Sequence, residues 1–314
     1  MSVSSNPNVT WSTVPTQTIT AGGVEFAYRE LGLHNPGPPV VFLIHLAAVL
    51  DNWDPRVVDG LAAKHRVITF DNRGIGASSG APATSIEQMA TDAITFMTAL
   101  GLEQVDLFGF SMGGMIAQEI VLMAPHLVRR MIIAGTGPAG GEGISTVARV
   151  TYLDMLRGVL TRQDPKQFLF FTRTPGGIRA GQAFLARLKE RSQNRDKEIT
   201  VAALQAQLKA LRRWGAKAPA DLSQIHQPVL VANGDHDRMV PSSNTRDLAR
   251  RLPNSDLIIY PDSGHGAVFQ FHEDFAPKAI YVCNTNMVAC RAIGRARMRP
   301  ATADDSPAAA PRVR

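Results

Sequence analysis

The chain has 314 residues, of which 45% are hydrophobic and 19% are charged, so it is long enough to bury a sizeable core. Its net charge of +6 is unevenly distributed: residues 139–227 carry 15 Lys and Arg against 7 Asp and Glu, residues 279–314 carry 6 against 2, and the remainder is acidic. These basic residues lack the interleaved aromatic side chains of nucleic-acid-binding stripes, so we expect no nucleic-acid partner.

The first residues, the apolar runs and the cysteine content narrow the class of protein further. The first residues are polar, and no run of about 18 apolar residues occurs in the chain. We therefore expect a cytoplasmic protein without a membrane partner. Both cysteines, Cys283 and Cys290, lie near the end of the chain, so we expect neither a disulfide framework nor a cysteine metal site in its main part.

The first third of the chain alternates between strand-like and helix-like segments. Residues 17–31 predict a β-hairpin with a Gly-rich turn. The apolar runs at residues 39–45 and 66–70 predict buried strands, and residues 55–65 between them predict a helix.

The alternation continues through the next segments. Residues 84–101 predict a helix that begins with a capping box formed by Ser85 and Gln88. Residues 104–110 and 128–135 predict strands on either side of another helix. This order is typical of an α/β fold with a mostly parallel sheet and helices on both faces.

The pattern changes in the middle of the chain. Residues 144–213 have a helical pattern without a convincing strand, and the alternation resumes after Pro228. A helical block inserted between two strands is expected to cap the carboxyl ends of the sheet, where open α/β sheets bind ligands. We therefore expect a core of residues 1–138 and 228–278 and a helical cap of residues 139–227.

The last segment, residues 279–314, is atypical. It is rich in Arg, Ala and Pro and shows no sustained apolar face, so we expect it to be partly disordered. Our hypothesis is that it comes from a shifted reading frame or a replaced terminus. Deletion after Lys278 would then leave folding and activity nearly intact.

One serine lies in a glycine-rich turn between a predicted strand and a predicted helix, in "GFSMGG" at residues 109–114. A sharp turn of this kind holds the Ser111 hydroxyl above the sheet at a helix N-terminus, and Gly109 and Gly113 avoid clashes there. A serine hydroxyl needs a base to become a nucleophile. Two later loops offer partners, because "NGDHDRMVP" supplies Asp235 and Asp237 and "DSGHG" supplies His265.

These motifs, together with the "DNRGIGAS" loop, resemble those of the α/β-hydrolase fold family, in its branch of serine esterases, lactonases, carbon–carbon hydrolases and cofactor-free haloperoxidases. The resemblance covers residues 17–278 and implies a catalytic triad of Ser111, His265 and Asp237. The family's spacing favours Asp237 over Asp235, which we expect to shape its loop.

The resemblance also implies an oxyanion hole formed by the backbone N–H groups of Met112 and Ala47. Leu46, in "HLAA", stands where the family usually has glycine. A misplaced Ala47 N–H would weaken catalysis, since loss of one such donor costs about 2.7–4 kcal/mol. We expect His45 and Arg73 to support the loops through hydrogen bonds rather than to react.

The expected function is hydrolysis of an ester, thioester or lactone of a small, largely apolar molecule through an acyl-enzyme, without a cofactor or metal. The same triad leaves cofactor-free haloperoxidase or perhydrolase chemistry open, and also hydrolysis of a carbon–carbon bond. A hydrolase-like receptor for a small ligand, with little turnover, is an alternative of another class that Leu46 favours. The basic residues 139–227 suggest, more weakly, that anionic substrates are attracted. The sequence leaves a homo-oligomer open.

Overall fold

The computed structural model describes residues 9–285, whose strands form one eight-stranded sheet in the order β1-β2-β4-β3-β5-β6-β7-β8. Strand β2 runs antiparallel to β1 and β4, and the neighbouring pairs from β4 to β8 are parallel. The strands are β1 (Gln17–Ala21), β2 (Val24–Leu31), β3 (Val40–Leu43), β4 (Val67–Phe70), β5 (Val105–Phe110), β6 (Val128–Ala134), β7 (Val229–Gly234) and β8 (Ser255–Tyr260).

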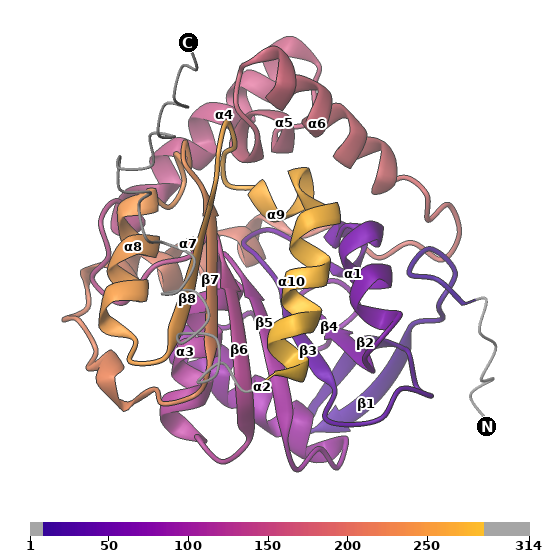
Figure 1. Cartoon of the computed structure of the whole chain (residues 1–314). Coiled ribbons are helices and arrows are strands. Elements are labelled where there is room, and N and C mark those ends of the chain that lie inside the picture. Colours follow the sequence, from indigo (N-terminus) through magenta and orange to yellow (C-terminus); the bar gives the residue numbers. More distant parts are fainter. Residues whose placement is uncertain (1–8, 286–314) are drawn as a thin grey trace, which may run out of the picture.

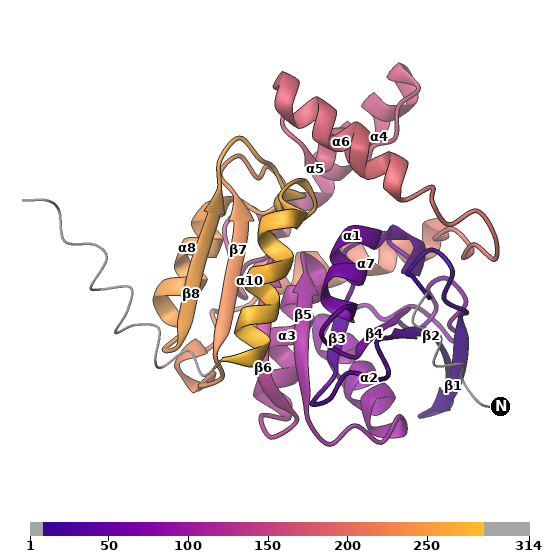
Figure 2. The same ribbon diagram turned by 45° about the vertical axis from the view of Figure 1, so that its right-hand side comes forward.

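Helices cover both faces of this sheet. Helices α1 and α10 pack together on one face, and α2, α3 and α8 cover the other (Figure 1, Figure 2). The helices are α1 (Pro55–Ala62), α2 (Ile86–Ala99), α3 (Met112–Met123), α4 (Val147–Thr161), α5 (Lys166–Phe170), α6 (Pro175–Arg187), α7 (Val201–Ala216), α8 (Ser242–Arg251), α9 (Ala267–Gln270) and α10 (His272–Asn284). The predicted α/β fold class is confirmed by this arrangement.

The central strands are apolar because both of their faces are covered. All residues of β3, β4, β5 and β7 are buried, which explains why these segments read as continuous apolar runs rather than as alternating ones. The helix signals also hold locally: the Ser85 hydroxyl accepts a hydrogen bond from the Gln88 amide at 3.2 Å and caps α2.

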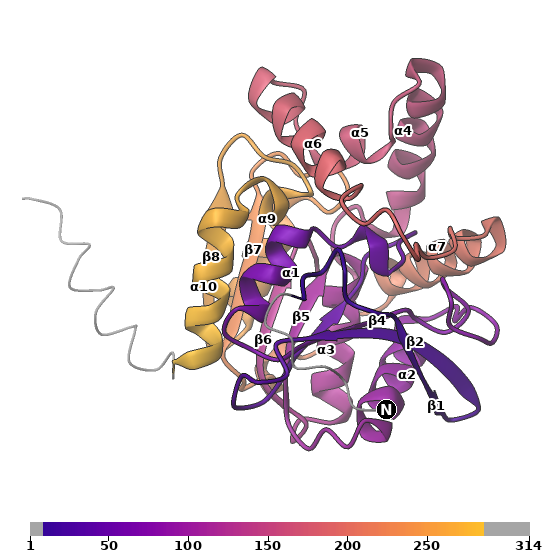
Figure 3. The ribbon, with the colours of Figure 1, turned by 90° about the vertical axis from the view of Figure 1, so that its right-hand side faces the viewer.

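Four helices, α4 to α7, lie between β6 and β7 in the chain, and we call them the inserted helices. Helices α4, α5 and α6 stand beyond the carboxyl ends of the parallel strands, and α7 lies apart from α5 and α6, closer to the sheet (Figure 3). In the chain, these helices lie where the sequence has its helical pattern, at residues 144–213. The division of the chain into a core and a cap stays a prediction.

The segment after Lys278 differs from expectation at its start. Helix α10 continues to Asn284, and Ala279, Val282 and Cys283 are buried in it. The Cys283 carbonyl also accepts a hydrogen bond from Arg129 Nη2 at 2.8 Å. Residues 279–284 therefore belong to a helix that began earlier in the chain, because their apolar side chains complete its buried face, and the expectation that the chain after Lys278 is dispensable stays a prediction.

The rest of that segment, residues 286–314 with Cys290, lies outside the described residues. Within residues 9–285, no helix has both the length and the apolar character needed to cross a membrane.

Candidate active site

Ser111 lies at the turn between β5 and α3. Its backbone is strained, with φ 56° and ψ −117°, a conformation that non-glycine residues rarely adopt. The turn is possible because of its glycines: a Cβ on Gly113 would lie 1.8 Å from the Leu43 carbonyl oxygen, and one on Gly109 would lie 2.4 Å from the Gly113 carbonyl oxygen. The sequence therefore places the Ser111 hydroxyl at the N-terminus of α3.

The structure brings Ser111, His265 and Asp237 together from three separate loops. His265 Nε2 lies 2.8 Å from Ser111 Oγ, and His265 Nδ1 lies 2.8 Å from Asp237 Oδ2. All three side chains are buried. Because a carboxylate only accepts hydrogen bonds, the Nδ1 atom carries the proton and Nε2 is free to accept one from the serine.

The two aspartates of the loop after β7 have different surroundings. The other oxygen of Asp237, Oδ1, accepts hydrogen bonds from the Met239 and Val240 amides at 2.8 and 3.0 Å. Asp235 instead accepts hydrogen bonds from the Asp262 and Ser263 amides, at 3.2 and 3.1 Å, and so joins two loops. Only Asp237, of these two carboxylates, is hydrogen-bonded to His265.

The inserted helices help to hold the His265 loop. The Gly266 amide donates to the carbonyl of Phe170, the last residue of α5, at 2.8 Å. The Phe170 ring also lies 5.5 Å from the His265 ring, and the Phe110 ring of β5 lies 5.1 Å from it. Packing between these rings restricts the imidazole to the orientation that faces Ser111.

The loop after β3 carries the "HLAA" segment. The His45 Nδ1–H donates to the Leu46 carbonyl at 2.8 Å, and complete burial lowers the pKa of His45 to about 3, so this imidazole is neutral. The left-handed backbone conformation falls on Ala47, with φ 57°, while Leu46 is not among the residues with positive φ in the described part of the chain. The branched Leu46 side chain is therefore accommodated without this strain.

The two predicted oxyanion donors lie on different elements. Met112 is the first residue of α3, so its N–H belongs to the unpaired amides at a helix N-terminus. The Ala47 N–H, in contrast, donates to Gln207 Oε1 of α7 at 2.8 Å. Sequence reasoning missed Gln207, because nothing in its helical segment distinguishes a side chain that reaches the loop after β3.

The "DNRGIGAS" loop braces its neighbours. Arg73 Nε donates to Asp92 Oδ2 of α2 at 2.9 Å, and Arg73 Nη2 bonds the other oxygen of the same carboxylate. Asp71, which the sequence did not single out, accepts a hydrogen bond from the Leu50 amide at 3.0 Å and so ties this loop to the loop after β3. Burial raises the pKa of Asp71 well above its usual value.

A cavity of about 190 Å³ opens on Ser111 and His265. Most of the side chains around it are apolar, and they come from both the sheet loops and the inserted helices: Leu46, Ala47, Met155, Leu169, Phe170, Leu204 and Met239. Among the large apolar side chains of residues 139–227, Phe170 lines this cavity, whereas Tyr152, Leu156 and Leu160 are exposed.

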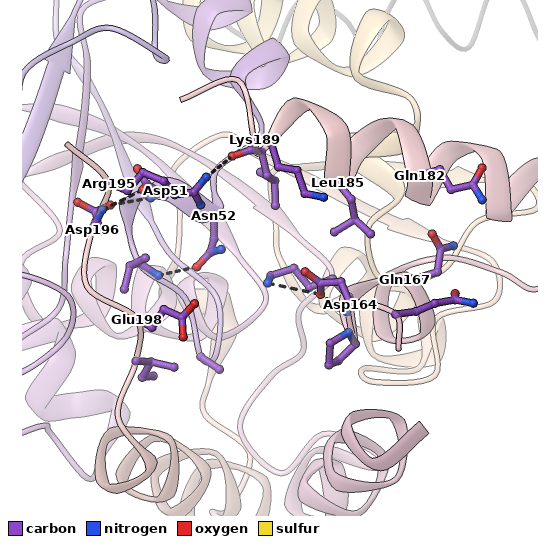
Figure 4. A pocket seen from close by; sticks show the side chains of 17 residues that line it. Asp51, Asn52, Asp164, Gln167, Gln182, Leu185, Lys189, Arg195, Asp196 and Glu198 are labelled. Carbon is purple, nitrogen blue, oxygen red and sulfur yellow. Dashed lines mark hydrogen bonds and ion pairs between the residues drawn. The ribbon is translucent and has the colours of Figure 1, made fainter. Parts of the chain in front are cut away.

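A second cavity of about 750 Å³ adjoins the first (Figure 4). The two share Ala47, Asp164, Pro165, Lys166 and Ile199 in their walls. The larger one is lined by many polar groups: Asp51, Arg195 and Asp196 lie together on one side of it, and Gln167 and Gln182 lie on the other (Figure 4).

Comparison with known proteins places the chain in a family. The family model described as the alpha/beta hydrolase fold matches residues 38–271. A solved structure titled an alpha/beta hydrolase fold protein from Chitinophaga pinensis is 35% identical, with a TM-score of 0.83, and the match covers 88% of this chain and 100% of that one.

Among curated relatives, a putative non-heme bromoperoxidase, BpoC, from Mycobacterium tuberculosis is 28% identical over 79% of this chain and 93% of its own length. A pimeloyl-[acyl-carrier protein] methyl ester esterase from Nitrosomonas europaea is 28% identical over 76% of this chain and 93% of its own length. The breadth of the family match, together with the solved relative at 35% identity, shows that the chain belongs to the α/β-hydrolase fold family.

Proposed function

We propose that this protein is a serine hydrolase that cleaves an ester, thioester or lactone of a small, largely apolar substrate through an acyl-enzyme. The observation that carries the proposal is the continuous hydrogen-bonded series of Asp237, His265 and Ser111, buried at the wall of an apolar cavity. As the sequence predicts, the substrate is a small molecule, the reaction uses no cofactor or metal, and the protein works in the cytoplasm.

The proposed chemistry follows from the positions of the three side chains. Ser111 Oγ attacks the substrate carbonyl while His265 Nε2 takes its proton, and Asp237 stabilises the resulting imidazolium through Nδ1–H. The imidazolium then donates its proton to the leaving group. In the second half of the reaction, His265 takes a proton from water, the water oxygen attacks the acyl-enzyme, and Ser111 leaves with the proton returned by His265.

The oxyanion of each tetrahedral intermediate needs donors that are already in place. The Met112 N–H at the start of α3 is one, supported by the helix dipole, and the Ala47 N–H, which donates to Gln207 Oε1 in the structure, is the second once that bond is broken. His45 and Leu46 shape the loop that carries Ala47, and Arg73 braces the neighbouring loop.

The two cavities indicate which part of the substrate binds in each. The apolar cavity of about 190 Å³ suits a small acyl group next to Ser111, and the adjoining polar cavity of about 750 Å³ suits the leaving alcohol or thiol. The charge of the larger cavity does not favour an anion, since three cations face four carboxylates in its lining: Lys166, Lys189 and Arg195 against Asp51, Asp164, Asp196 and Glu198.

Cofactor-free perhydrolysis is the second candidate. The small Ala47 side chain leaves space beside the oxyanion site, and the relative from Mycobacterium tuberculosis is named a putative non-heme bromoperoxidase. In this reaction hydrogen peroxide replaces water in the second half of the cycle. Peracid formation from acetate and peroxide, compared between the native protein and Ser111→Ala, tests it.

Labelling by a fluorophosphonate tests the main proposal. The native protein should label at Ser111 and hydrolyse p-nitrophenyl esters, with short acyl chains preferred, and Ser111→Ala should do neither. Asp237→Asn should lower kcat by about 10⁴-fold, since it stabilises the wrong imidazole tautomer. The matched Asp235→Asn should lower it at most several-fold. A native protein that folds but fails to label would favour the ligand receptor instead.

A further inference from the structure

A buried glutamine of the inserted helices accepts a hydrogen bond from one of the two proposed oxyanion donors. Gln207 of α7 is only 1% exposed. It shares a helix face with Leu204 and Leu211, three residues before it and four after it. Leu204 lines the cavity beside Ser111, Leu211 lines a narrower hollow that also reaches Ser111, and Leu46 borders both. Gln207 itself lines neither hollow, and its side chain reaches the Ala47 N–H in the loop that borders the cavity beside Ser111.

The Gln207 amide is bonded at one end only. Its Oε1 accepts the Ala47 N–H at 2.8 Å, while its Nε2 is buried and has no hydrogen-bond partner among the described residues. On burial the Nε2 group loses its hydrogen bonds to water and gains none from the protein, which costs free energy. Among the described residues, the amide of Gln207 thus makes a single hydrogen bond, which a competing acceptor can replace.

The acceptor that competes is the substrate. An N–H group carries one hydrogen, so the Ala47 amide cannot make a full hydrogen bond to Gln207 Oε1 and to the carbonyl oxygen of an acyl group at once. We propose that Gln207 is a positioning residue that occupies the Ala47 donor in the resting protein and gives way to the substrate's carbonyl oxygen. This inference rests on the proposed function, because it assigns Ala47 to the oxyanion hole.

The competition has a direct consequence for catalysis. Substrate binding has to break the bond between Ala47 and Gln207, so a side chain of similar length that is only a weak acceptor should free the donor. One neutral hydrogen bond is worth about 2- to 10-fold in an equilibrium, so Gln207→Met should raise kcat/KM by that factor, mainly through a lower KM. Gln207→Glu should lower kcat/KM at least about 10-fold, since a carboxylate binds the donor more strongly and repels the oxyanion.

The test uses the full-length protein with p-nitrophenyl butyrate as substrate and a fluorophosphonate as the probe of Ser111. Native protein, Gln207→Met, Gln207→Glu and a control, Gln205→Met, are compared for kcat, KM, labelling rate and thermal unfolding. Gln205 lies on the exposed face of the same helix, so its variant should match the native protein.

The opposite signs of the two Gln207 variants separate the inference from a merely structural role. If Gln207 only held Ala47 in its left-handed conformation, Gln207→Met would lose activity and Gln207→Glu, which keeps the acceptor, would retain it. That result overturns the inference, as does a Gln207→Met protein no faster than the native one. Failure of the native protein to label at Ser111 would instead overturn the proposed function.

Discussion

At the residue scale, the site depends on how burial fixes the protonation and orientation of single side chains. His45 illustrates this: its ring is buried between Phe110 and Phe170, its Nδ1–H is bonded to the Leu46 carbonyl, and its Nε2 has no hydrogen-bond partner among the described residues. A second proton on this ring would be a buried, unpaired charge. The neutral imidazole is therefore part of the support for the loop that carries Ala47.

His45 should make stability fall in acid. Its pKa is about 3 in the folded protein, below the usual 6.5, so its contribution is present above pH 6.5 and is lost as the pH falls toward 3. Between pH 8 and pH 5.5, the free energy of unfolding of the native protein should drop by about 1.4 kcal/mol more than that of His45→Asn, which keeps a donor but does not titrate. Urea unfolding at the two pH values measures this difference, and equal drops would contradict the assignment.

Sequence reasoning identified residues that have a reactive side chain and lie in a recognisable local motif. Ser111 stands in a strand-turn-helix glycine motif, and His265 and Asp237 follow later strands, so the rule that parallel strands end at one edge brings them together. Gln207 and Asp71 were missed because their roles depend on which loop they face.

At the scale of elements, the pattern of burial decides where a helix or strand ends. Strand β3 covers Val40–Leu43 within the apolar run at residues 39–45, because the remaining residues leave the sheet to form the loop with His45. Helix α10 runs past Lys278 to Asn284, although Pro277 lies inside it. A local pattern cannot fix such boundaries, since neighbouring elements provide the surface on which the last turn packs.

The end of α10 should contribute to stability. Deletion after Lys278 removes the buried Ala279, Val282 and Cys283 and exposes the face of α1 on which the helix packs. We expect a loss of about 3 kcal/mol or more in the free energy of unfolding, or failure to fold. Deletion after Thr285 is the control, because it keeps the whole helix. Thermal and urea unfolding of the two truncated proteins compare them, and equal stability would show that the last turn of α10 is dispensable.

At the scale of the whole molecule, charged side chains join the segment between α6 and α7 to the sheet. Arg29 of β2 is fully buried and bonds Asp51 and Asp196, each at 2.8 Å. The backbone N–H of each aspartate also donates to the carboxylate of the other, at 2.8 and 2.9 Å. Burial is the largest cause that raises the pKa of Asp196 to about 6. Arg29 pairs with both carboxylates and so offsets the cost of bringing them together, while Arg191 and Arg195 lie 3.5 and 3.6 Å from Asp51 alone.

Removal of Arg29 should therefore cost much more than removal of Arg56 of α1, which forms an exposed ion pair with the same segment between α6 and α7. Arg29→Met leaves two buried carboxylates without their shared cation, and we expect a loss of about 3–5 kcal/mol in the free energy of unfolding. Arg56, which pairs with Glu190 at 2.7 Å on the surface, provides the matched control, and Arg56→Met should cost less than about 1 kcal/mol. Urea unfolding at pH 7 compares them; similar losses would mean that burial does not set the cost.

The sequence by itself determined the α/β class, the order of strands and helices, the helical insertion and the three residues proposed as the triad. These features depend on periodicity and on short motifs that are contiguous in the chain. Only the tertiary structure decided that Ala47 takes the left-handed conformation and that its N–H donates to Gln207 Oε1. It also decided that Arg29 pairs with two aspartates and that α10 continues to Asn284. Each of these joins side chains or surfaces from distant parts of the chain, and their meeting is set by packing rather than by local sequence.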